Sequence, residues 1–380
     1  MRQIYRNSFA TIVAACGKNV HEGFLRQNRP QKVPDAKVPF ICPDGTVGSV
    51  WIAAEFDTTT GDATRTYYDE LEPMNFRGWC LQERLLSPRC LIYASHTLQL
   101  WCQHETVNVG QALCEPSNGL RLPSSVWLSE EHGQSVSPSD GETSRQAWLN
   151  VIFDYTLRKL SISGDKLVAI AAVAEQFNHV WNSQYLAGLW QHTLLLDLLW
   201  YNTGLFELNP RPGIYRAPSW SWASIDDHVV AQSFEDRFEP GAYDLAECDI
   251  LGCKVTPASA DVPFGQVSSG TLILEGHLKE ATLQYTKSDQ KSGNTLVQLD
   301  MDGVSEVVSV GWARMDALEE KSNIWIIPML WDKGGEFMEG LIVTAAGEGY
   351  FRRVGHFTNH YGSKDITWVS SAPKQIITLI

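Results

Sequence analysis

The sequence predicts an α+β protein whose helical and β-rich parts are segregated along the chain. Apolar residues recur at helical spacing through the middle of the chain, and short β-like runs separated by glycine turns fill it from residue 245 onward. The N-terminal part has only partial α/β character. A length of 380 residues is enough for two or three hydrophobic cores. We expect a partial α/β module at 1–115, a linker at 116–145, a helical segment at 146–225 packed on the β domain, and a β-rich domain, an antiparallel sandwich or barrel, at 226–380.

Composition is that of a soluble globular protein, with 44% hydrophobic and 19% charged residues. The net charge of −14, with no lysine- or arginine-rich block, argues against nucleic acid or an anionic lipid surface as the partner. Fourteen tryptophans predict large aromatic cores. No apolar run reaches membrane-spanning length, since the longest candidate, Leu194–Tyr201, contains Asp197.

Eight cysteines contain no C-x-x-C pair. The single cysteine–histidine cluster, Cys102, His104 and Cys114, lacks a fourth ligand at a normal spacing, so we expect no metal. Free thiols in a reducing compartment predict a cytoplasmic protein. The apolar run Phe9–Ala15 is too short and too polar to favour a signal peptide.

The front of the chain is predicted to contain a helix at Arg2–Arg6 and a strand at Thr11–Ala15, as in the second half of an α/β unit. Residues 25–70 are polar and proline-punctuated, and Val47–Glu55 is their only strand-like run. We expect this segment to be loop-rich.

The segment Asn75–Glu105 organises the first module. A helix from about Asn75 should stop near Leu86, because Pro88 cannot extend it. Two strands, Arg89–Ala94 and Leu98–Cys102, should then form a hairpin.

Glu83 is the candidate site residue of this helix. Helical spacing places it on one face with Phe76, Trp79 and Cys80, so its carboxylate should be substantially buried. One interpretation is a buried ion pair with a neighbouring arginine that fixes the helix on the hairpin. The other is a site glutamate with a raised pKa in an aromatic pocket. The arginines close to it in sequence are Arg77, Arg84 and Arg89.

Three helices are expected after the linker, whose most linker-like part is Ser135–Gly141. They are Ala147–Leu160, Asp165–Trp181 and Gln184–Tyr201, and the last is apolar on nearly every side, which predicts a buried central helix. His192 and Asp197 on it should be satisfied hydrogen-bonding groups of the core or, alternatively, ligands.

The stretch Ala217–Ser224 alternates hydroxyls with indoles. As a strand it would place Trp220 and Trp222 on one face, either in the core or as the aromatic wall of a pocket. Eight β strands should follow. They are Ala246–Val255, Gly270–His277, Thr295–Leu299, Val307–Val310, Ile324–Leu330, Gly340–Thr344, Tyr350–Phe357 and Ile376–Leu379.

Two motifs connect the chain to a known family. Arg77-Gly78-Trp79-Cys80-Leu81-Gln82-Glu83 followed by Leu86-Ser87-Pro88-Arg89 resembles the "R-x-W-T-x-Q-E … L-S-P-R" signature of the fungal heterokaryon-incompatibility (HET) domain, with Cys80 in place of threonine. Further matching stretches follow in the family's order. They are Met1–Tyr5 with Thr11–Ala15, Ala187–Trp190, Ala217–Ser224, and the ending Gly340–Ile342, Arg353–Gly355 and Ile377–Ile380. The family's "S-Y-x-W-G" and "W-x-D-x-x-C-I-x-Q" elements do not occur, so the chain resembles a member that lacks the front of the domain.

The resemblance implies a role in fungal non-self recognition after hyphal fusion, with triggering of programmed cell death. It also implies a remnant of a distantly TIR-like, flavodoxin-type fold, in which some relatives cleave NAD with a glutamate. That role could fall only on Glu83, with NAD as a substrate and not a bound cofactor. The resemblance makes Arg77, Trp79, Gln82, Arg89, Trp220 and Trp222 the binding or structural signature.

Standard catalytic motifs are absent from the sequence, including the phosphate-binding glycine loop, the dinucleotide fingerprint and the G-x-S-x-G elbow. Three functions therefore compete. The first, which we favour, is a non-catalytic signalling module that self-associates, near residues 1–24, or binds a protein partner. The second is an NAD-cleaving enzyme that uses Glu83. The third is a ligand-binding accessory protein with a tryptophan-lined pocket.

Overall fold

A computed structural model of the chain divides into two compact units, Met1–Leu122 and Pro123–Ile380. Each unit is described by itself. The structure describes residues 2–21, 23–25, 36–52, 71–95, 97–109, 116, 119–127, 138–204, 207–231, 243–284, 294–299, 308–319, 323–332, 334–359, 369 and 373–380. In this part of the chain, no helix is long and apolar enough to cross a membrane.

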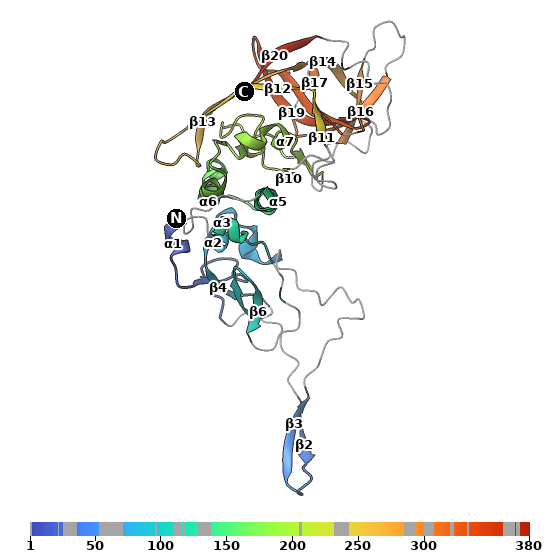
Figure 1. Cartoon of the computed structure of the whole chain (residues 1–380). Helices are drawn as coiled ribbons and strands as arrows, with labels where there is room; N and C mark the ends of the chain where they lie inside the picture. The colour runs from blue at the N-terminus through green and yellow to red at the C-terminus, as the bar shows by residue number, and fades with distance from the viewer. Residues whose placement is uncertain are drawn as a thin grey trace. The chain divides into compact units, whose positions relative to one another are not determined.

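The unit Met1–Leu122 is built on a four-stranded sheet in the order β1-β4-β5-β6. The β1/β4 pair is parallel and the other two pairs are antiparallel. The predicted first helix, the first strand and the hairpin are confirmed (Figure 1). The elements are α1 (Arg2–Arg6), β1 (Thr11–Val13), β2 (Ala36–Ile41), β3 (Val47–Ile52), η4 (Pro73–Phe76), α2 (Gly78–Leu86), β4 (Arg89–Tyr93), β5 (Leu98–Cys102) and β6 (Thr106–Val109).

Two details of this unit differ from the prediction. Strand β2 was not expected, because Pro39 interrupts it, but β2 pairs only with β3 among the described strands and proline is tolerated on such an edge strand. The helix α2 starts at Gly78 instead of Asn75, because the chain at Pro73–Phe76 forms a separate 3₁₀ turn.

The helical part of the second unit comes first along the chain and contains a cluster of packed aromatic side chains. T-shaped contacts join Trp148 to Phe177 and Trp190, and Trp181 to Trp190. The elements are α3 (Ser124–Trp127), α5 (Pro138–Thr156), η5 (Ser163–Asp165), η6 (Val168–Ile170), α6 (Ala171–Trp181), β7 (Tyr185–Leu186), β8 (Leu189–Trp190), η7 (Gln191–Thr193), α7 (Leu194–Asp197), β9 (Tyr201–Asn202), η8 (Trp222–Ser224) and β10 (Val229–Val230).

The helix predicted at Gln184–Tyr201 is wrong. Ala187 and Gly188 have φ values of 51° and 102°, which a helix cannot contain, and they form the turn between β7 and β8. The helical elements that remain in this range are the 3₁₀ turn η7 and the four-residue α7. Two other helices shift. Residues 138–145 of the expected linker belong to α5, and the residues before Ala171 form 3₁₀ turns.

The β-rich part closes into a barrel. Strands β14, β15, β16, β19, β18 and β17 each pair antiparallel with the next, and β17 pairs again with β14. β11 extends the sheet from β17, and β20, β13 and β12 extend it from β19. The bounds are β11 (Tyr243–Ala246), β12 (Asp249–Pro257), β13 (Val267–His277), β14 (Lys279–Gln284), β15 (Asn294–Leu299), β16 (Val308–Met315), β17 (Ile324–Asp332), β18 (Met338–Ala345), β19 (Tyr350–Asn359) and β20 (Lys374–Leu379).

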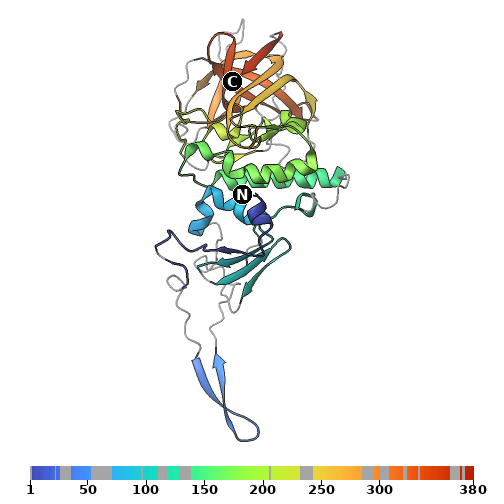
Figure 2. The same ribbon diagram turned by 90° about the vertical axis from the view of Figure 1, so that its left-hand side faces the viewer.

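All eight predicted strands are present, and β11 and β14 were missed. A buried apolar cluster that includes Ala313, Ile326, Ile342 and Phe357 forms the core of the barrel. Both views place α5 and α6 toward one end of the barrel (Figures 1 and 2). The α+β class is therefore confirmed.

Candidate functional site

The helix α2 buries a different face from the one expected. Its buried residues are Gly78, Leu81, Gln82, Arg84, Leu85 and Leu86. Phe76 lies outside the helix and is exposed, whereas Trp79, Cys80 and Glu83 are half-buried. The predicted buried face, with Phe76, Trp79, Cys80 and Glu83, was wrong because Phe76 is not part of the helix. The apolar Leu81, Leu85 and Leu86 form the buried face instead.

Glu83 is engaged by α1 of its own unit. α1 packs against α2, and the hydroxyl of Tyr5 donates a hydrogen bond to the Glu83 carboxylate. Partial burial raises the pKa of Glu83, although the Tyr5 hydrogen bond and the charge of Arg77 act in the opposite direction. Burial, together with the carboxylate, raises the pKa of Tyr5 to about 12. Desolvation thus outweighs the arginine charge at Glu83.

The end of α2 is fixed to the sheet by signature residues. Ser87 donates to the carbonyl of Glu83 at 2.7 Å, and its hydroxyl lies 2.7 Å from that of Thr11 on β1. Arg89 places its guanidinium over the Phe9 ring and donates to the Phe9 carbonyl. The "L-S-P-R" residues therefore hold α2, β1 and β4 together. Of the other signature residues, Gln82 is buried in this unit and Arg77 is exposed.

Trp220 and Trp222 are core residues of the second unit, both fully buried. The strand predicted for them is wrong, because Ser221 accepts a hydrogen bond from the Ala223 amide and starts the 3₁₀ turn η8. The Trp222 indole donates to the carbonyl of Gly188 at 3.0 Å, and the carbonyl of Trp220 accepts from the Trp200 indole at 2.9 Å. Core packing, not a pocket wall, is what their burial supports.

The hydrogen bonds of Asp197 confirm the core interpretation of that residue. Its carboxylate is buried and accepts from the Trp190 amide and the Thr193 hydroxyl. His192, in contrast, is exposed and contacts Ser183, so the expectation that it is a core residue was wrong.

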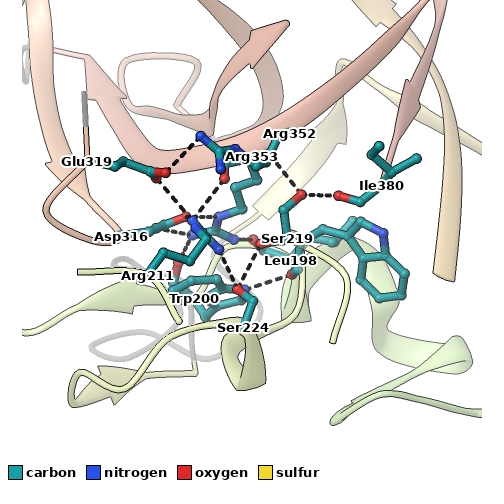
Figure 3. A network of polar contacts seen from close by, with 11 residues as sticks. Leu198, Trp200, Arg211, Ser219, Ser224, Asp316, Glu319, Arg352, Arg353 and Ile380 are labelled. Atoms are coloured by element: carbon teal, nitrogen blue, oxygen red, sulfur yellow. Dashed lines mark hydrogen bonds and ion pairs between the residues drawn. The ribbon is translucent and has the colours of Figure 1, made fainter. Parts of the chain in front are cut away.

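A network of buried arginines joins the barrel to the chain between Leu198 and Ser224 (Figure 3). Arg353 on β19 is fully buried and donates to both oxygens of Asp316, at 3.1 and 3.3 Å. Its other donors reach the carbonyls of Leu198 and Trp200, and its guanidinium carbon lies 3.6 Å from the centre of the Trp200 ring. Its own amide donates to the Ser219 hydroxyl at 3.0 Å.

Arg211 extends the network toward the surface. It donates to the Ser224 hydroxyl at 2.7 Å and to the carbonyl of Arg353 at 3.1 Å. It also lies 3.7 Å from the Asp316 carboxylate and 3.3 Å from that of Glu319, which binds Arg352 at 2.8 Å as well. Three guanidinium groups thus share two carboxylates.

The arginines of this network were not selected from the sequence. Arg353 was noted only within the stretch Arg353–Gly355 that resembles the family's ending. Its role in the network was not visible there, because its side-chain partners lie 37 or more residues away. Glu83, Arg77, Trp79, Gln82 and Arg89 belong to one unit, and Trp220 and Trp222 belong to the other.

No family model matches the chain, and no curated protein or solved structure is significantly similar to it.

Proposed function

We propose that the protein is a non-catalytic signalling protein of the HET type, which acts through self-association along strand β1. The resemblance of Arg77–Arg89 and Ala217–Ser224 to the HET signature supports the class, and with it a cytoplasmic role in fungal non-self recognition and programmed cell death. The parallel pair β1/β4 is compatible with a remnant of a flavodoxin-type sheet.

The observation that carries the mechanism is the position of β1. β1 is the last strand of its sheet and, among the described strands, it pairs only with β4. Unpaired amide and carbonyl groups of an edge strand are a template for another strand. Three apolar side chains around it are strongly exposed: Ile4, Phe9 and Ile12, with exposed fractions of 68%, 87% and 63%. Exposed apolar groups beside an open edge favour association.

The proposed partner is a second copy of the chain. Two identical edge strands can pair antiparallel about a two-fold axis, so one patch serves both subunits. Sedimentation velocity of the full chain should therefore show a dimer at tens of micromolar concentration, an order-of-magnitude choice for weak association.

A charge on the edge tests the surface directly. Ile12→Lys should weaken dimerisation at least about tenfold, because lysine on an edge strand opposes pairing. Val262→Lys, at a side chain that is also exposed but lies in the other unit, is the matched control and should dimerise like the wild type. A wild type that stays monomeric, or equal weakening by both variants, would contradict the proposal.

The second candidate function is NAD cleavage by Glu83. It is favoured by the raised pKa of this half-buried glutamate, since catalytic carboxyl groups often have shifted pKa values. The hydrogen bond from Tyr5 argues against it, because the carboxylate is already engaged within its own unit. The role that this contact favours for Glu83 is to position α1 on α2.

A further inference from the structure

A pocket of about 350 Å³ lies beside the buried arginine network of the unit Pro123–Ile380. One wall is the loop from Arg211 to Ala217, and another is the start of β13 at Ser268–Thr271. Arg352 and Ile380 complete it. Its volume falls in the range of small-molecule sites.

The lining is positively charged in a protein whose net charge is −14. Three arginines, Arg211, Arg216 and Arg352, line the pocket, and none of the described lining side chains is acidic. The main-chain carboxylate of Ile380 also lies in the lining and accepts hydrogen bonds from the Ser219 amide and hydroxyl. The carboxylates that pair with these arginines, those of Asp316, Glu319 and Asp226, are not among the described residues that line the pocket. Among the described residues, Arg211, Arg352 and Arg353 pair with the carboxylates of Asp316 and Glu319, so three cationic side chains face two anionic ones.

Two of the lining arginines keep buried N–H groups that find no hydrogen-bond partner among the described residues. Arg216 uses Nε on the Ala223 carbonyl and Nη1 on Ser163 and Asp226, while its Nη2 is unpartnered and its side chain is 3% exposed. Arg211 has an unpartnered Nε. Because unsatisfied buried donors are costly, two of them on one pocket suggest an acceptor supplied by a ligand.

The walls are held in place before any ligand binds. Arg353 fixes Ser219 through its amide, and Arg216 fixes the turn at Ala223. Gly270 approaches Pro218 so closely that a Cβ atom there would lie 2.2 Å from the proline ring. A preformed site loses less free energy to ordering on binding.

The rest of the lining combines an apolar and aromatic part with the hydroxyls of Ser219, Ser224, Ser268, Ser269 and Thr271. Ile214 and Tyr215 are both exposed, and Pro212 and Ala217 adjoin them on the same loop. Guanidinium groups match the geometry of carboxylate and phosphate oxygens, and an aromatic side chain offers a surface for a ring or an apolar chain.

We infer that this pocket binds a small organic oxyanion, in which a carboxylate or phosphate group faces the arginines and an apolar or planar part lies against Ile214 and Tyr215. The site lies in Pro123–Ile380, whereas the proposed self-association involves Met1–Leu122, so either can fail without the other.

Calorimetric titration of the full chain tests this with four probes: phenyl phosphate, benzoate, inorganic phosphate and benzyl alcohol. We expect phenyl phosphate or benzoate to bind with a Kd of about 1 mM or tighter, and benzyl alcohol to bind at least about tenfold more weakly. Tighter binding of phenyl phosphate assigns the phosphate class, and tighter binding of benzoate assigns the carboxylate class. Inorganic phosphate should bind more weakly than phenyl phosphate, because it lacks the apolar part.

Two variants and one control locate the site. Arg352→Gln should weaken binding of the better probe at least about tenfold. Lys374→Gln is the matched control, since both side chains are 37% exposed and ion-paired, and it should bind like the wild type. Ser269→Trp keeps every charge and should block binding by filling the pocket.

Three outcomes would overturn the inference. One is no binding of either anionic probe by folded wild-type protein, and another is equal affinity for benzyl alcohol. The third is equal weakening by Arg352→Gln and Lys374→Gln, which would mean that only general charge matters.

Discussion

Replacing Asp316 by asparagine should destabilise the unit Pro123–Ile380 by about 3–5 kcal/mol. The substitution keeps the shape of the side chain but removes its negative charge. Asp316 and Arg353 are both fully buried, so water cannot compensate for the loss. The expected cost is that of leaving a buried cation without its counter-ion.

Geometry puts the expected value in the upper half of that range. Asp316 accepts two hydrogen bonds from Arg353, and the guanidinium of Arg211 lies 3.7 Å from the same carboxylate. An asparagine would turn an N–H group toward one of these cations. Burial already lowers the pKa of Arg353, which shows that its charge is poorly solvated.

Urea unfolding measures the effect, followed by tryptophan fluorescence and far-UV circular dichroism. Because the chain forms two compact units, the data are fitted with one and with two transitions, and the better fit is used. Asp249→Asn is the control, because the exposed pair of Asp249 with Lys374 at 3.7 Å should contribute less than about 1 kcal/mol. A loss below about 1 kcal/mol for Asp316→Asn would refute the reasoning.

Three further predictions concern the same unit. Trp222→Ala should cost about 3–5 kcal/mol in the urea assay, because a fully buried indole and its bond to Gly188 are lost; wild-type stability would instead favour the pocket-wall interpretation. Gly188→Ala should cost at least about 1–3 kcal/mol, since φ is 102° and the new Cβ would lie 2.6 Å from the Trp222 indole nitrogen; a neutral effect on the urea midpoint would contradict this packing. Burial lowers the pKa of His228 to about 4, so the unfolded state takes up the proton first and stability should fall as the pH drops from about 6.5 to about 4. His228→Gln should reduce the decrease of the urea midpoint between about pH 6.5 and about pH 4. An unchanged pH dependence of the midpoint would show that other groups cause it.

Elements set by local signals were predicted well from the sequence. Pro88 ends α2 after Leu86, and the alternating run around Ser95 forms the hairpin of β4 and β5. The eight predicted strands of the second unit are also present, and glycine turns or runs of β-branched residues mark several of them.

Local sequence patterns did not predict the backbone of the segment Gln184–Tyr201. Its composition correctly indicated burial, but burial does not specify whether the chain follows a helix. The turn depends on Ala187 at φ 51°, a conformation rare for a residue with a side chain, and on the carbonyl of Gly188, which accepts from Trp222. Neither the positive φ of Ala187 nor the hydrogen bond from Trp222, 34 residues away, can be predicted from the neighbouring sequence.

The arginine network could not be predicted either, because its contacts join residues that are far apart in the sequence. Arg353 takes its partners from Asp316, Trp200 and Leu198, which only the closed barrel brings to it. For Glu83, helical spacing indicated burial but left two interpretations open, an ion pair with an arginine or a raised pKa. The raised pKa is the one that the structure supports, and the partner Tyr5, on a different helix, was not predicted.

NAD consumption by the purified full chain tests the central claim, that the protein signals without catalysis. Wild type and Glu83→Gln are compared at protein concentrations below and above the dimerisation range, so that an activity of the assembled form is not missed. We expect no NAD loss beyond the buffer blank for either protein at any concentration. NAD loss by the wild type that Glu83→Gln abolishes, with the variant still folded, would contradict it.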